Sequence, residues 1–181
     1  MATAQEPLIA VMYSPGNVQR EDSIVAAKDD AIQELETAYQ QFRGKIADLS
    51  DDAYREQWLG TWSLSELLAH MEGWWREMAG GFARVAAGQR PTPEGVSYTD
   101  ADAWNEKFTQ KTTAGKDALT AWDAGYGEYV SAARALPDDQ YGVDSANGKP
   151  RIGNRLLQGA GVHHFAEHEE QLDAWLAGRT S

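Results

Sequence analysis

The sequence contains no cysteine, which excludes disulfides, thiolate metal sites and cysteine nucleophiles. Basic charge is also scarce, because 16 Lys and Arg stand against 28 Asp and Glu and leave a formal net charge of −12. A surface of this sign repels phosphate backbones and anionic membranes, so we expect neither nucleic acid nor a membrane as partner. No apolar run approaches the ~20 residues that span a bilayer, and residues 1–19 lack the pattern of a secretory signal. The sequence therefore predicts a soluble, cytoplasmic protein.

Alternation of apolar and polar residues is missing as well, so we expect negligible β-structure. A length of 181 residues with 42% apolar residues fits a single domain that can bury a core. Seven tryptophans are many for this length. Large aromatic side chains fill cores and also line pockets for small molecules, and composition alone leaves both interpretations open.

Residues 1–21 carry Pro7, Pro15 and Gly16 without a helical period, and we interpret them as an extended N-terminal arm. A first helix is predicted to begin at Asp22 or Ser23, because apolar residues then recur three and four apart as far as residue 49. Residues 22–178 are predicted to form the folded domain, and residues 179–181 a C-terminal tail.

Three further helical segments follow. The second begins at a capping box formed by Ser63 and Glu66 and runs to about residue 85. The third is predicted as a short helix from Asp100 followed by a longer one that ends before Pro137, and the fourth runs over 152–177 and ends at Gly178. This organisation predicts an all-α four-helix bundle.

The histidines are the strongest candidates for chemistry. His164 and His168 are four residues apart, which places both side chains on one helix face. That face continues the apolar stripe of the helix and is therefore directed into the bundle. His70 lies at the edge of the apolar stripe of the second helix. Three imidazoles leave coordination positions open, as in catalytic metal sites, and imidazole suits zinc, nickel, copper or iron. The alternative is that these are ordinary core histidines bonded to carbonyl groups.

Several other residues are candidates for the same pocket. Trp74, which shares the helix face of His70, and Trp104 are predicted to form walls, with Tyr98 and Asn105 as polar contacts. Glu66 and Glu167 are candidate partners of the imidazoles, although Glu66 is already explained by the capping box and Glu167 by a solvated surface. Gly159 and Gly161, one turn before His164, indicate either close helix packing or room for a ligand. His163 is expected to point away from His164.

Two segments resemble a known family. Residues 60–74, GTWSLSELLAHMEGW, are similar to the second-helix signature of the DinB-like (DinB/YfiT) superfamily, and residues 163–176, HHFAEHEEQLDAWL, to its last helix. The ending of the second segment, together with Ala103, Trp104 and Asn105, looks like the ClbS/DfsB subgroup. The resemblance implies an up-and-down four-helix bundle of the DinB-like type, frequently a homodimer, with a divalent transition metal such as zinc, nickel or iron on His70, His164 and His168.

The resemblance also implies a function. We expect a metal-dependent enzyme that hydrolyses a small electrophilic compound or transfers a thiol to it, in resistance or detoxification. A non-catalytic protein that sequesters a small molecule in the same pocket is the alternative, and a bundle that acts by oligomerisation alone is a third possibility. A shared fold does not select the reaction.

Overall fold

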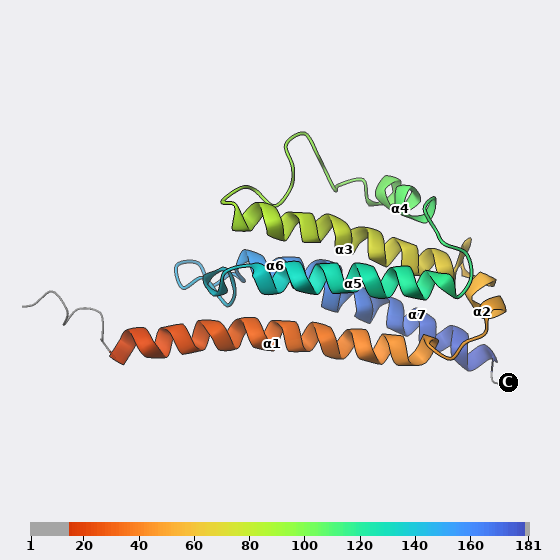
Figure 1. Ribbon diagram of the computed structural model, residues 1–181, viewed down its shortest axis with the longest axis horizontal. Helices are drawn as coiled ribbons and strands as arrows, with labels where there is room; N and C mark the ends of the chain where they lie inside the picture. Colours follow the sequence, from red (N-terminus) through yellow and green to blue (C-terminus); the bar gives the residue numbers. More distant parts are fainter. Residues whose placement is uncertain (1–14, 180–181) are drawn as a thin grey trace, which may run out of the picture.

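The computed structural model describes residues 15–179, with side chains from residue 27 onward. Within these residues, four long helical segments lie side by side as a bundle (Figure 1). They are α1 (Pro15–Ile46), α3 (Leu64–Ala86), α5 (Asp117–Ala135) and a last segment made of α6 (Ile152–Leu157), a π-turn (Gln158–Val162) and α7 (His163–Arg179). Shorter elements are α2 (Asp51–Arg55), α4 (Ala101–Thr109) and a 3₁₀ turn (Asp138–Gln140). The predicted all-α bundle is confirmed. None of the described helices is long and apolar enough to cross a membrane.

Two predicted helix ends were wrong. The first helix begins at Pro15 and not at Asp22 or Ser23, so residues 15–21 are helical and not extended. Proline suits the first helical turn, because its fixed φ is helical and its missing N–H would have no partner there. The last helix continues through Gly178 to Arg179, since Gly178 lacks the positive φ of a glycine cap. Residues 1–14 and 180–181 lie outside the described residues, so the predicted division into arm, bundle and tail stays a prediction.

The predicted capping box at the start of α3 is confirmed. The Glu66 carboxylate accepts the backbone N–H of Ser63 at 2.7 Å, and the Ser63 hydroxyl oxygen accepts the backbone N–H of Glu66 at 3.3 Å. These bonds satisfy two donors that the first turn would otherwise leave unpaired. They commit the Glu66 carboxylate to the helix start and fix the beginning of the helix that carries His70.

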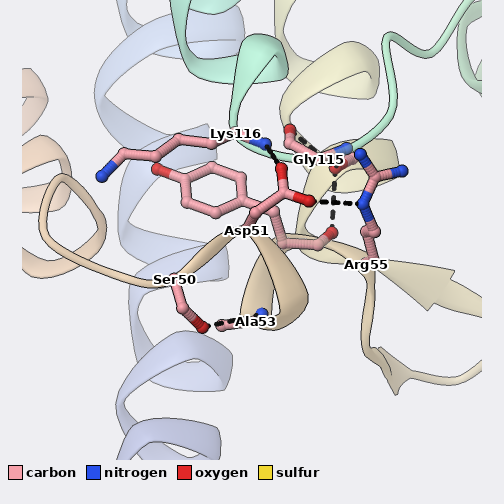
Figure 2. A network of polar contacts seen from close by, with 8 residues as sticks. Ser50, Asp51, Ala53, Arg55, Gly115 and Lys116 are labelled. Atoms are coloured by element: carbon pink, nitrogen blue, oxygen red, sulfur yellow. Dashed lines mark hydrogen bonds and ion pairs between the residues drawn. The ribbon is translucent and has the colours of Figure 1, made fainter.

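A polar network holds α2 and the N-terminal end of α3 against the turn that precedes α5 (Figure 2). The Asp51 carboxylate accepts the backbone N–H of Lys116 at 2.8 Å and the Nε–H of Arg55 at 2.6 Å. The buried Ser65 hydroxyl accepts the backbone N–H of Gly115 at 3.0 Å. Gly115 has φ +76°, and a Cβ there would lie 2.2 Å from the Asp51 carboxylate, so only glycine fits this turn. The N-terminal end of α3 is thereby fixed relative to the N-terminal end of α5.

A small hairpin departs from the expectation of negligible β-structure. Strands β1 (Gln57–Leu59) and β2 (Trp62–Ser63) pair antiparallel immediately before α3. Gly60 supplies the positive φ, +61°, in the connecting turn. The hairpin is too short to show an alternating pattern in the sequence, but it places Trp62 beside α3.

Aromatic side chains from all four long segments fill the core. Tyr39 of α1 stacks on Tyr126 of α5, with ring centroids 3.6 Å apart. Trp75 of α3 and Trp122 of α5 are fully buried, and both pack against Phe165 of α7. These tryptophans therefore serve the core, the first of the two interpretations that composition left open.

The two glycines of the π-turn serve different purposes. A Cβ on Gly161 would lie 2.5 Å from Leu35 Cδ1, so Gly161 permits close packing of the last helix on α1. A Cβ on Gly159 would meet nothing within 4 Å. Close packing requires glycine at position 161, whereas no contact requires glycine at position 159.

This difference predicts opposite effects of two alanine substitutions. Gly161→Ala is expected to destabilise the protein by about 1–3 kcal/mol, because the buried Leu35 must be displaced. Gly159→Ala is the matched control in the same turn and is expected to leave stability unchanged or raise it by up to about 1 kcal/mol, since alanine favours helical backbone. Urea unfolding of both variants measures the two effects, and equal losses would contradict the packing assigned to Gly161.

Candidate metal centre

The three predicted ligands meet inside the bundle. His70 comes from α3, and His164 and His168 come from the first turns of α7. All three side chains are buried, and one ring nitrogen from each lies within 4.8 Å of the other two. The structure therefore brings together the residues that helical spacing and the family resemblance selected.

A π-turn directly precedes the two histidines that begin α7. His164 lies four positions after Ala160, the spacing that places two residues on one face of a helix. His163 is exposed, whereas His164 is buried. The Trp75 indole N–H donates to the carbonyl oxygen of Ala160 at 2.8 Å and joins the turn to α3.

Hydrogen bonds orient the imidazoles. Nδ1 of His168 lies 2.8 Å from the side-chain oxygen of Gln171. An amide oxygen only accepts, so Nδ1 carries the proton and Nε2 holds a free lone pair. This Nε2 is buried and has no hydrogen-bond partner within the described part of the chain. Nε2 of His70 and Nε2 of His164 lie 2.7 Å apart, so one of these two nitrogens carries a proton.

The donor set fits a divalent transition metal. The buried Nε2 of His168 has a lone pair without a donor, and it faces two further ring nitrogens. Zinc bound tetrahedrally at ~2.0–2.1 Å would place its nitrogens about 3.3–3.4 Å apart. The 2.7 Å pair of His70 and His164 would then open by about 0.6–0.7 Å. The hydrogen bond of His168 to Gln171 is of the kind that fixes a ligating imidazole in its tautomer.

Burial keeps the imidazoles neutral. Loss of solvation, with repulsion from His168, lowers the pKa of His70 to about 4. Loss of solvation and repulsion from His70 and His168 lower the pKa of His164 to about 3. Burial also lowers the pKa of His168, although Gln171 opposes this shift. At neutral pH the three lone pairs therefore face little competition from protons, which is the state that binds a metal.

The histidines open onto a cavity of about 880 Å³. Trp74, Tyr98 and Asn105, three of the four residues predicted to contact a ligand, line this cavity. The Trp74 indole N–H donates to the Asn105 side-chain oxygen at 2.9 Å. Trp104 is not among the lining residues but packs behind Trp74 and Tyr98, with ring centroids 6.2 and 5.2 Å away. The roles of these four residues in substrate binding stay predictions.

The lining residues that the sequence analysis did not select include an aromatic, a cationic and an amide side chain. Trp62 reaches the site through the hairpin, and its ring lies 5.0 Å from the His70 ring. Arg155 lines the cavity from α6. Gln171 could have been found, since it lies one helical turn after His168 on the same face. The two carboxylates proposed as partners behave differently: Glu66 caps α3, and Glu167 is exposed at the cavity wall.

The fold and the site define a helical-bundle protein with a buried three-histidine centre open to a cavity. The chain matches the family described as the DinB superfamily over residues 34–172, and it belongs to that family. No curated protein matches the chain by sequence.

Solved structures share the fold. DfsB, described as a sibling lethal factor precursor, has a TM-score of 0.68 at 14% identity, covering 84% of this chain and 96% of DfsB. The colibactin self-resistance protein ClbS, in complex with double-stranded DNA, has a TM-score of 0.66 at 17% identity, covering 81% and 93%. The mycothiol-dependent maleylpyruvate isomerase has a TM-score of 0.62 at 14% identity, covering 80% of this chain and 60% of the isomerase. The predicted resemblance to ClbS and DfsB is confirmed at the level of the fold.

The lowered pKa values predict an acid-sensitive stability. The unfolded chain protonates a histidine near pH 6.5, whereas the pKa of His70 in the folded protein is about 4. Between these values the unfolded state binds more protons, so the stability of metal-free protein falls as pH falls. One such histidine contributes on the order of 1–2 kcal/mol to this loss at pH 5.

Urea unfolding at pH 7 and pH 5 measures this loss. Carboxylates titrate in every variant, so the difference between variants isolates the histidines. His70→Gln is expected to lose less stability than wild type on acidification. His163→Gln, which changes an exposed histidine, serves as the control and is expected to follow wild type. An identical acid loss in wild type and His70→Gln would rule out the assigned cause.

Proposed function

We propose that this protein is a metal-dependent enzyme that hydrolyses a small electrophilic compound or transfers a thiol to it. One observation carries the proposal: the buried, unpartnered Nε2 of His168 faces the ring nitrogens of His70 and His164 beside the cavity of about 880 Å³. A metal-binding triad closed off from solvent would suit a structural role. A triad that opens onto a large cavity favours a reaction at the metal.

Different side chains would bind the metal and the substrate. His70, His164 and His168 would hold zinc, nickel or iron, all of which imidazole suits. Such a metal lowers the pKa of a bound water or thiol and makes it a nucleophile near neutral pH. Gln171 holds the His168 ring in position through Nδ1.

The aromatic residues would bind the substrate. Trp62 and Trp74 present ring surface to the cavity for an apolar substrate. Asn105 is fixed by the Trp74 indole and adds a polar contact at the wall. Tyr98 and Trp104 pack around Trp74 and keep this wall in place.

The names of similar proteins support the two reaction classes. ClbS is described as a self-resistance protein, and the isomerase as mycothiol-dependent. A role in resistance or detoxification, with or without a thiol co-substrate, is therefore part of the proposal. The proposal covers both reaction classes and specifies neither one metal nor one substrate.

The proposal includes a homodimer and a cytoplasmic location, both as expectations from the sequence. We expect no nucleic acid as partner of this chain, whereas the structure of the similar protein ClbS contains double-stranded DNA. The fold therefore does not exclude such a partner. The net charge of −12 remains the argument against it for this chain.

Metal content tests the centre. Protein purified without a histidine tag or nickel column is expected to contain one transition metal per chain by elemental analysis. His168→Ala is expected to lose that metal, because the buried Nε2 is removed and two imidazoles remain. His163→Ala, which changes the adjacent exposed histidine, is expected to retain it. Metal-free wild-type protein that gains no stability on adding zinc, nickel or iron would refute the three-histidine site.

Turnover separates catalysis from sequestration. Metal-loaded protein is expected to convert an epoxide, a cyclopropane or a quinone-type electrophile repeatedly, with or without a low-molecular-weight thiol. Product analysis over many equivalents of substrate measures this, and His168→Gln is expected to reduce the rate at least 100-fold, since the nucleophile would no longer be activated. Saturation at one equivalent without product would instead establish the alternative, a sequestering protein.

A further inference from the structure

Arg155 is an unpaired cation on the cavity wall. It projects from α6 and lines the same cavity as the histidines. Within the described residues, no hydrogen bond or ion pair engages its guanidinium. Most other described arginines are paired, for example Arg76 with Glu72 and Glu128 and Arg134 with Glu36, whereas Arg90, which is also unpaired, lies outside this cavity. Since 28 acidic residues are available for 16 basic ones, a free guanidinium at a cavity indicates that its partner comes from outside the chain.

Gly159 leaves open space on the cavity wall, at a position between Arg155 and His164 in the sequence. Gly159 lies one turn after Arg155 and also lines the cavity. A side chain there would contact nothing within 4 Å, so packing does not require glycine. Glycine costs roughly 0.5–1 kcal/mol relative to alanine inside a helix. The missing side chain therefore enlarges the cavity that Arg155 and His164 both line.

The spacing places Arg155 and His164 at separate points along the cavity. Arg155 and His164 are nine residues apart, which corresponds to roughly 13 Å along a helix axis at about 1.5 Å per residue. Glu167 also lines the cavity, three residues after His164 and twelve after Arg155, and so lies toward the end at which the histidines meet. Its negative charge disfavours an anion at that end, so the two charges give the cavity a direction.

We propose that Arg155 binds a carboxylate of the ligand whose reacting group lies at the three histidines. This rests on the proposed function, in that it takes the cavity as the substrate site. Guanidinium pairs with carboxylate through two parallel N–H···O bonds and so fixes orientation as well as position. The carboxylate belongs either to the electrophile or to a thiol co-substrate.

Matched acids and neutral analogues test the anion site. Zinc-loaded protein is titrated with ω-mercaptoalkanoic acids of increasing length and with mercaptoalkanols of the same lengths, using calorimetry. A parallel series compares epoxyalkanoic acids with neutral epoxides. The acids are expected to bind on the order of 10- to 100-fold more tightly than their neutral partners. In the thiol series this preference should peak at one chain length, because the sulfur and the carboxylate are held at separate points.

Two variants separate Arg155 from the general charge of the protein. Arg155→Met is expected to abolish the preference for acids and leave binding of the neutral analogues unchanged. Arg90→Met is the matched control, because Arg90 is an exposed arginine that does not line this cavity. It is expected to bind every probe as wild type does. A preference in the thiol series assigns the carboxylate to the thiol, and one in the epoxide series assigns it to the electrophile.

The outcome that overturns the proposal is an absence of acid preference in both series, or a preference that survives in Arg155→Met. Failure of the metal site is distinguished by a third arm. Metal-free protein is titrated with alkanoic acids and alkanols, and tryptophan fluorescence reports binding beside Trp62 and Trp74. A preference for acids that depends on Arg155 would persist there even if no metal bound, whereas its absence from all three arms excludes the anion site.

Discussion

The hydrogen bond between the Trp75 indole and the Ala160 carbonyl joins the middle of α3 to the π-turn of the last helix. Trp75 is fully buried, so its N–H needs an acceptor, and an unpaired one would cost about 1–3 kcal/mol. The bond fixes the position and the rotation of the last helix against α3. His70 and His164 lie on these same two helices, and their convergence depends on this contact. Packing of the core and assembly of the site therefore share one constraint.

The fold was largely predictable because four segments bury one face each, and this burial appears in the sequence as a three-and-four spacing. The capping box at Ser63 was equally readable, since its side chains act on their own helix turn. The errors have local causes. Pro15 suggested an extended chain although proline suits a first helical turn, and the hairpin before α3 is too short to alternate.

The site was predictable where it depends on spacing within one helix. His164 and His168 followed from their four-residue separation and inward face, whereas His70 required the family resemblance, because its position depends on how two helices pack. Trp62 reaches the site by the hairpin, and Arg155 lines the cavity from α6, the segment before the π-turn. The π-turn has no distinctive sequence signal, since Gly159 and Gly161 are compatible with an ordinary helix. Contacts between distant segments therefore account for most of what was missed.

The separation of the ligands along the chain has a consequence for folding. His70 and His164 are 94 residues apart, yet their ring nitrogens are neighbours. A metal held by both would act as a crosslink that closes a large loop of the chain. By the entropy of loop closure, tying a loop of this size restricts the unfolded chain by an amount on the order of 4–5 kcal/mol. In a sequence without cysteine, such a metal crosslink would stabilise the bundle as a disulfide stabilises other proteins. Unlike a disulfide, it would form and break as the concentration of available metal changes.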